Sequence, residues 1–349
     1  DYLYILYEMI KYDIKIDILF KYWLIISLLL VFLIIIVGGL TRLTDSGLSI
    51  TQWELFKGIL PPLNDAAWIQ YFDRYKEIPQ YKILNFNMSL KEFKIIFYWE
   101  YFHRILGRVI GLFFIIPLIF FYLSKKIKIK YLNYCSIIFL LILIQGTIGW
   151  YMVKSGLVND ITVSHYRLSL HLSTAVAIIG MIFWLLLNFN KKTFKVFFNF
   201  SKKNIPFLLL LFLIYLQIII GAFVSGLDAG LIYQTWPLMN TSYFPNDLIF
   251  KNLSTYTDFN NHSLVQFYHR NLAYIILLYF LILSFYIIRK KIKKLYNPIF
   301  LVSFFLTLQV VLGIYTLISG LNIYSASAHQ ITSILLIFSS INLYFCNIK

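Results

Sequence analysis

The chain has 349 residues, of which 60% are hydrophobic and 13% charged, and its formal net charge is +16. Soluble domains carry about 25% charged residues, so this composition excludes a soluble globular protein and indicates an integral membrane protein. The positive charge does not indicate nucleic-acid binding, because the lysines gather in short segments between apolar runs, where they set membrane topology.

Eight apolar runs are long enough to cross a bilayer, which takes about 20 residues each. The sequence therefore predicts an all-α membrane protein with spans at 22–40, 105–123, 132–153, 168–189, 205–225, 266–288, 298–318 and 329–347. Clusters of lysine and arginine follow the second, fourth and sixth spans. Because cytoplasmic loops carry the basic excess, these loops and both termini are predicted to face the cytoplasm.

The chain repeats itself once. The matching segments are Asp45–Leu48 with Asp228–Leu231, Gln145–Gly149 with Gln309–Gly313, Phe102–Arg104 with Tyr268–Arg270, and His171 with His329. Each unit contains four spans, an even number, so the two halves enter the membrane in the same orientation. We therefore expect two tandem four-helix bundles related by a pseudo-twofold axis along the membrane normal.

These patterns divide the chain into four segments. They are an N-terminal cytoplasmic segment (1–21), a first four-helix bundle (22–190), a cytoplasmic linker (191–204) and a second four-helix bundle (205–349). The first 21 residues mix acidic and basic side chains and resemble neither a cleavable signal peptide nor a basic, Ser-rich presequence. The expected location is therefore a bacterial plasma membrane.

Four histidines occupy matching places in the two halves: His103, His171, His269 and His329. Each stands at the start of an inward-running span, so all four should lie at similar depth near the outer face. Ionisable residues inside spans are costly and usually mark function, and histidines on alternate helices of one bundle can face each other across its core. The sequence thus predicts two metal-binding pairs, His103 with His171 and His269 with His329.

The expected metal is iron in a porphyrin. The residue one helical turn after each histidine is small, which leaves room on the same helix face for a flat macrocycle. These residues are Gly107, Ala175, Ala273 and Ser333. Small residues also favour close helix packing in membranes, so both interpretations stay open. Zinc fits poorly because no cysteine or carboxylate cluster accompanies the pairs, whereas two axial imidazoles complete the coordination of a porphyrin iron.

Three arginines near these histidines are candidate cofactor-binding residues. Arg104 and Arg270 each directly follow a histidine, where they can pair with haem propionates. Positioning the outer ends of the helices is their competing role. Arg108 occurs only in the first half, and Tyr274 takes its place in the second.

The two predicted pockets differ in one acidic residue. Glu100 lies three residues before His103 on the same helix face, whereas the matching residue of the second half is Gln266. This difference indicates reaction in the first half and electron storage in the second, with drift after duplication as the alternative. Glu100, His103 and His171 are therefore the candidate catalytic residues.

Several long motifs resemble haem A synthase, in the form found in mitochondria and related bacteria. The motifs are Val37–Ser49, Trp53–Pro62, Glu100–Arg108, Tyr166–Leu172 and Gly221–Gly230. The resemblance runs from about residue 25 to the C-terminus. It implies a membrane enzyme that oxidises one methyl group of haem O to a formyl group by successive hydroxylations, giving haem A for cytochrome oxidase.

The resemblance also implies how the two pairs are used. His103 and His171 match the pair of the substrate-haem pocket, with Glu100 as the family's acidic residue, and His269 and His329 match the pair that binds a resident haem b. The expected ligands are haem b, haem O and haem A. Beyond the lipid bilayer, haem O synthase, cytochrome oxidase assembly factors and a second copy of the chain are candidate partners.

Two departures from the family pattern stand out. The outer-loop cysteine pair of some members is absent, since Cys135 and Cys346 both lie in spans near their inner ends. His165 lies near His171 where a different polar residue is expected, and only His171 has a partner in the repeat. We expect His165, like the unmatched His262, in an outer loop or at the membrane interface.

Two other functions are open at this point. A di-haem b-type cytochrome that only transfers electrons explains four histidines but leaves Glu100 without a role. A transporter built from a parallel repeat explains the duplication but not the histidine pairs.

Overall fold

The computed structural model describes residues 2–53, 57–158, 161–189, 191–248 and 253–348. Within these ranges the chain is mostly helical, and eight helices are long and apolar enough to cross a membrane. The first half contributes α1 (Tyr2–Leu43), α4 (Leu90–Ser124), α5 (Ile129–Gly156) and α6 (His165–Asn188). The second contributes α7 (Ile205–Gly226), α9 (His262–Arg289), α10 (Tyr296–Ile318) and α11 (Ile323–Asn347). The predicted all-α protein with eight spans is confirmed.

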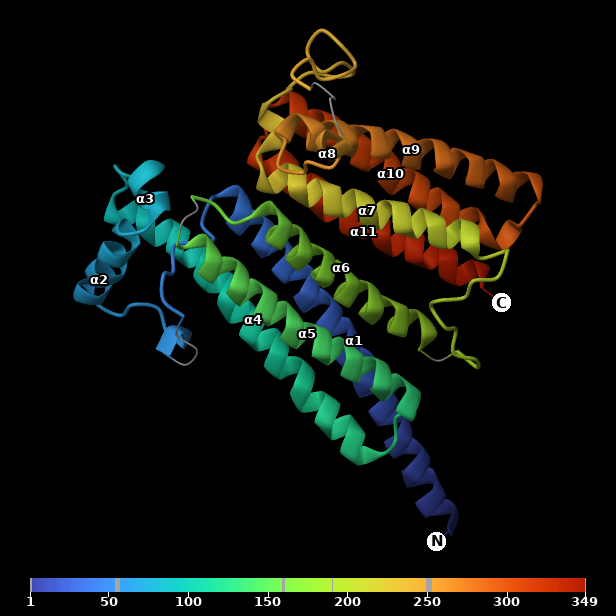
Figure 1. Ribbon diagram of the computed structural model, residues 1–349. Helices are drawn as coiled ribbons and strands as arrows, with labels where there is room; N and C mark the ends of the chain where they lie inside the picture. The colour runs from blue at the N-terminus through green and yellow to red at the C-terminus, as the bar shows by residue number, and fades with distance from the viewer. Residues whose placement is uncertain (1, 54–56, 159–160, 190, 249–252, 349) are drawn as a thin grey trace.

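The eight long helices form two groups of four that lie side by side (Figure 1). In the first half, α1 and α5 each contact both α4 and α6; in the second, α7 and α10 each contact both α9 and α11. The halves thus share one pattern of neighbours, as expected for a duplication in which both units have the same orientation, and the exact axis stays a prediction. The halves meet through α6, α7, α1 and α11.

The segment expected at 1–21 is part of a helix. α1 runs from Tyr2 to Leu43 without a break, and its membrane-spanning part begins at Lys15. Between the two halves, α6 ends at Asn188 and α7 begins at Ile205, on either side of the predicted linker. Lys195 in this linker donates hydrogen bonds from Nζ to the carbonyl oxygens of Phe345 (3.0 Å) and Ile348 (2.5 Å), which close the end of α11.

Helix α4 begins well before its predicted span. Ser89 caps the helix: its Oγ accepts a hydrogen bond from the backbone N–H of Glu92 (3.3 Å), and the Glu92 carboxylate accepts one from the Ser89 N–H (2.8 Å). This reciprocal capping box starts the helix at Leu90. His103 therefore lies well inside α4, and the expectation that every histidine stands at the start of its helix was wrong for this one.

A small helical layer lies between α1 and α4 in the chain and covers the start of α4. It contains α2 (Asp65–Lys76) and α3 (Pro79–Ile83), which lie beyond the ends of the long helices in Figure 1. Buried side chains of α2, among them Trp68 and Phe72, pack against Phe93 and Phe97 of α4 in a core separate from that of the bundles. Shorter elements are η1 (Lys57–Ile59), η2 (Ala229–Leu231), α8 (Leu253–Tyr256) and η3 (Lys293–Leu295).

Arg42 connects the two halves near the C-terminal ends of α1 and α7. Its guanidinium pairs with Asp45 of its own half (2.9 Å) and with Asp228 of the other (2.9 Å), and it donates to the carbonyl of Ser225 (2.7 Å). Deeper in the bundle, Gln330 of α11 donates to the carbonyl of Ile35 in α1 (2.9 Å). The bundles are therefore joined by polar contacts as well as by apolar packing.

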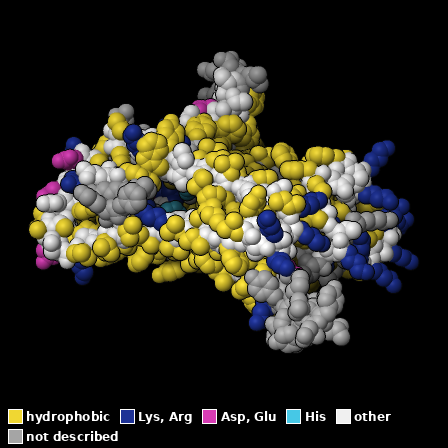
Figure 2. Space-filling model, turned by 90° about the horizontal axis from the view of Figure 1, so that it is seen from below, with side chains coloured by type: hydrophobic (Ala, Val, Ile, Leu, Met, Phe, Trp, Pro, Cys, Tyr) yellow, Lys and Arg dark blue, Asp and Glu magenta, His cyan; other side chains and the backbone are white. Residues whose placement is uncertain are grey.

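Charge is distributed unevenly along the molecule. Figure 2 shows lysine and arginine side chains gathered at one end and acidic side chains near the other, with an apolar surface between them. An apolar belt with one basic end is typical of a protein that spans a membrane.

Both cysteines, Cys135 and Cys346, are free thiols, and Cys135 is buried.

Candidate functional site

The structure brings the four matched histidines together as two pairs. His103 of α4 and His171 of α6 have ring centroids 6.3 Å apart, with an interplanar angle of 61°. His269 of α9 and His329 of α11 have ring centroids 6.5 Å apart, with an interplanar angle of 76°. The predicted pairing within each half is therefore what the structure has, and the rings lie across the core of each bundle.

This geometry fits one metal between two imidazoles. A metal–imidazole bond is about 2 Å long, so two rings sharing one metal have centres about 6 Å apart. The Nδ1 atoms of all four rings are buried and make no hydrogen bond; such atoms are rare in native proteins and commonly mark an ion or ligand site. In the described part of the chain, no group of three or more His, Cys, Asp or Glu side chains could hold a bare ion. Iron in a porphyrin needs only two protein ligands.

Each imidazole is packed against a glycine of the neighbouring helix, a feature missing from the predicted site. A Cβ added at these positions would lie 2.9–3.0 Å from Cε1 of the facing ring. The pairs are Gly38 with His103, Gly149 with His171, Gly221 with His269, and Gly313 with His329. Any side chain there would push the ring out of place. The repeat contains the signal, since Gly221 follows Gly38 at the 183-residue offset of the Asp45 and Asp228 motifs.

Glu100 is buried, at 2% exposure, and its carboxylate is fully engaged. Oε2 accepts hydrogen bonds from the Ser49 hydroxyl (2.7 Å) and the Ile50 N–H (2.8 Å), while Oε1 accepts two from the Arg104 guanidinium (2.6 and 3.1 Å). The guanidinium also lies over the ring of Trp53, with its carbon 5.5 Å from the centroid. Glu100 is thus one turn from His103 and held as half of a buried ion pair.

The second half repeats this arrangement with an amide, Gln266, in place of the carboxylate of Glu100. Arg270 donates to the carbonyl of Tyr233 (2.8 Å), as Arg104 does to that of Ile50 (3.0 Å). Gln266 donates to the same Tyr233 carbonyl (2.9 Å), and its Oε1 is buried without a hydrogen bond. Both arginines therefore tie an outer segment to the histidine helix, which is the positioning role that competed with propionate binding.

The other predicted residues are placed less centrally. His165 is the first residue of α6, 8% exposed, with its ring centroid 5.6 Å from that of Phe223 in α7. His165 thus begins a spanning helix and does not lie in a loop, while its place at the membrane interface stays a prediction. His171, not His165, faces His103. Arg108 lies four residues beyond Arg104 in α4 and is partly buried.

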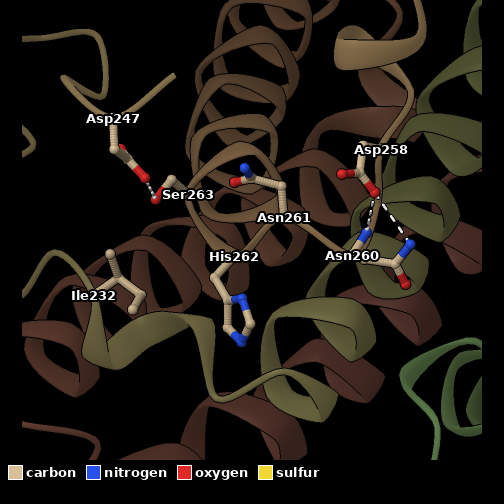
Figure 3. Close-up of a pocket in the computed structure, with 7 residues that line it drawn as sticks. All are labelled: Ile232, Asp247, Asp258, Asn260, Asn261, His262 and Ser263. Carbon is tan, nitrogen blue, oxygen red and sulfur yellow. Dashed lines mark hydrogen bonds between the residues drawn. The ribbon is translucent and has the colours of Figure 1, made fainter. Parts of the chain in front are cut away.

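A separate open pocket of about 390 Å³ lies beside the start of α9 in the second half. It is lined by Ile232, Asp247, Asp258, Asn260, Asn261, His262 and Ser263 (Figure 3). Asp247 accepts hydrogen bonds from Ser263 (2.6 Å) and from the hydroxyl of Tyr233. Burial raises the pKa of Asp247, but these hydrogen bonds together lower it by more. The pKa of Asp247 is therefore below its usual value. The exposed His262 lines this pocket, apart from the histidine pairs.

Comparison with known proteins agrees with this site. A family model described as cytochrome oxidase assembly protein matches residues 21–341. The chain is 53% identical over 322 residues to a haem A synthase of Pelagibacter ubique, covering 91% of this chain and 94% of the relative. It is 45% identical over 258 residues to a haem A synthase of Parvibaculum lavamentivorans, covering 74% of each. It is 41% identical over 320 residues to one of Rickettsia bellii, covering 90% and 94%. The chain therefore belongs to the family of cytochrome oxidase assembly proteins.

Proposed function

We propose that this protein is a haem A synthase, which oxidises a methyl group of haem O to a formyl group by successive hydroxylations and so makes haem A for cytochrome oxidase. The observation that carries the proposal is the presence of two histidine pairs of nearly equal spacing, 6.3 and 6.5 Å, of which only the first has a buried carboxylate beside it. An electron-transfer cytochrome needs both pairs but has no use for this difference.

The first half is the reaction site in this proposal. His103 and His171 hold the substrate haem, while Arg104 and Arg108 lie on the same helix as His103, near enough in sequence to meet the propionates. When bound, the iron porphyrin supplies the redox chemistry and carries the methyl group. The chain itself supplies two histidines that would hold the iron, a partly buried arginine and a buried carboxylate.

Glu100 acts as a fixed negative charge. Its ion pair with Arg104 and its two further hydrogen bonds hold the carboxylate in one place before the reaction begins. A preorganised charge in a buried site stabilises positive charge that develops nearby. Oxidation of a methyl carbon makes that carbon electron-poor, so a carboxylate one helical turn from His103 lowers the barrier. Proton acceptance by Glu100 would require release of the Arg104 ion pair.

The second half holds a resident haem b between His269 and His329 and stores electrons. Arg270 there is partly buried next to His269, and the buried Gln266 takes the place of a carboxylate. We further propose that the protein lies in a bacterial plasma membrane with both termini in the cytoplasm and the haem sites nearer the outer face. The basic inner end and the bacterial relatives support this location. Haem O synthase, assembly factors or a second copy of the chain are the expected protein partners.

Pigment analysis tests the function. The chain is expressed in a bacterial host that makes haem O but has no haem A synthase, and the membrane haems are extracted and separated. Haem A should accumulate, and the purified protein should contain haem b together with haem O or haem A. A purified protein that contains haem b alone, in membranes without haem A, would be the electron-transfer cytochrome instead.

A further inference from the structure

The residue one turn before each ring-contacting glycine differs among the four histidines. It is Gln145 for His171, Gln217 for His269 and Gln309 for His329. For His103 the residue is Ile34, which precedes Gly38 on α1 as Gln217 precedes Gly221 on α7. Residues four apart share a helix face, so each of these side chains lies beside the histidine that its glycine contacts. Three histidines have an amide neighbour, and His103 has an aliphatic one.

The three amides make hydrogen bonds at the histidines. Gln145 donates to the carbonyl of His171 (2.9 Å), and Gln217 donates to that of His269 (2.9 Å) with its nitrogen also 3.4 Å from the ring Nε2. The amide nitrogen of Gln309 lies 3.2 Å from Nε2 of His329. The Gln309 oxygen in turn accepts a hydrogen bond from Thr332 (2.5 Å), which fixes the amide. Gln145 and Gln217 therefore tie the backbone of a histidine to the neighbouring helix, whereas Gln309, fixed by Thr332, packs against the ring of His329.

Ile34 can provide no such bond to His103. Its side chain is directed toward α4, because a Cβ built at Gly107 would lie 3.7 Å from the Ile34 Cδ1. Gly107 is the small residue one turn after His103. Ile34 thus fills the space beside the first-half pair by apolar packing alone. The backbone and ring of His103 have no amide partner on α1.

We propose that Gln145, Gln217 and Gln309 hold three of the histidines in fixed positions and that Ile34 leaves His103 as the exchangeable ligand of the substrate haem. This inference rests on the proposed function. An enzyme that takes in haem O and releases haem A breaks both axial bonds in every cycle, whereas a resident haem stays bound. Both ligands of the second half are held by amides. In the first half His171 is held by Gln145, and His103 is free to leave first.

Transfer of haem to an acceptor protein tests this assignment. The purified protein, carrying the haems acquired in a host that makes haem O, is mixed with excess apomyoglobin, and the remaining pigments are extracted and separated over time. Haem O and haem A should leave faster than haem b. Ile34→Gln should slow their release about fivefold, the factor contributed by one neutral hydrogen bond, and leave haem b release unchanged. Gln217→Ile should speed haem b release about fivefold.

Ile34→Leu is the matched control, because it alters packing without adding an amide. It should release haem O and haem A at least as fast as the wild type. The assignment is overturned if Ile34→Gln and Ile34→Leu release these haems at the same rate, or if Gln217→Ile leaves haem b release unchanged. Should Ile34→Gln fail to fold, Gln217→Ile decides the outcome. Failure of the proposed function shows differently, as pigments that contain haem b alone in the wild type.

Discussion

The two halves of the molecule have kept one scaffold and differ in the polar groups around it. The histidine pairs have nearly the same spacing, and each ring meets a glycine at nearly the same distance. Arg104 and Arg270, which directly follow His103 and His269, donate to carbonyls at the same place in the repeat, those of Ile50 and Tyr233. The differences include Glu100 against Gln266, Ile34 against Gln217 and Arg108 against Tyr274. A duplicated site can thus be given two tasks by exchanging a few side chains on a similar backbone.

The largest expected effect comes from making the first half resemble the second. Glu100→Gln should lower the rate of haem A formation roughly 100-fold, the scale seen when one preorganised stabilising group is removed from an active site. Bound haem should be unchanged, because Gln266 shows that an amide fits this place beside an arginine. Haem A is measured in extracted pigments, and Gln266→Glu is the control in the other half. Undiminished haem A in Glu100→Gln would remove Glu100 from the mechanism.

The glycine contacts provide the second comparison. In Gly221→Ala the new methyl group would lie 3.0 Å from Cε1 of His269, so the ring must move. Overpacking of this kind costs about 1–3 kcal/mol, and we expect the variant to lose much of its haem b. Gly111→Ala is the matched control, because no atom lies within 4 Å of a Cβ at that position. Equal haem b content in both variants, measured from reduced-minus-oxidised spectra, would show that the glycine does not position the ring.

Arg42 allows the contact between the halves to be weakened without touching either histidine pair. Its repeat counterpart is Ser225, so one arginine serves the matching carboxylates of Asp45 and Asp228. Both carboxylates are about half exposed, which limits the contribution of the ion pairs. Arg42→Ala should therefore lower the free energy of unfolding by about 1–2 kcal/mol. Thermal unfolding in detergent measures this loss, and an unchanged Tm would show that apolar packing alone joins the halves.

The repeat made the histidine pairs predictable from the sequence. Contacts between segments far apart in the chain were not predictable in this way. Matching offsets identified the four histidines and their pairing, because duplicated residues keep their places. Hydropathy placed the spans but missed the start of α4, where the capping box of Ser89 and Glu92 begins a helix ahead of the apolar run. The partners of Glu100 were missed because Ser49 and Ile50 reach it only through the folded outer segment.

The smallest expected effect is a pH dependence at the junction of the halves. Burial raises the pKa of Asp45 above 3.8, Arg42 lowers it and the charge of Asp228 raises it, with a net increase. Since the folded protein binds this proton more tightly than the unfolded chain, Asp45 makes folding less favourable as the pH rises from 3.8 through the raised pKa. Asp45→Asn removes this dependence. As the pH rises across that range, the Tm of the variant should therefore increase relative to the Tm of the wild type. Because Asp45 is about half exposed, solvent screening keeps the shift small. A Tm difference that is constant over this range would mean that the Asp45 carboxylate is equally solvated in both states, and that Arg42 and Asp228 balance at the junction.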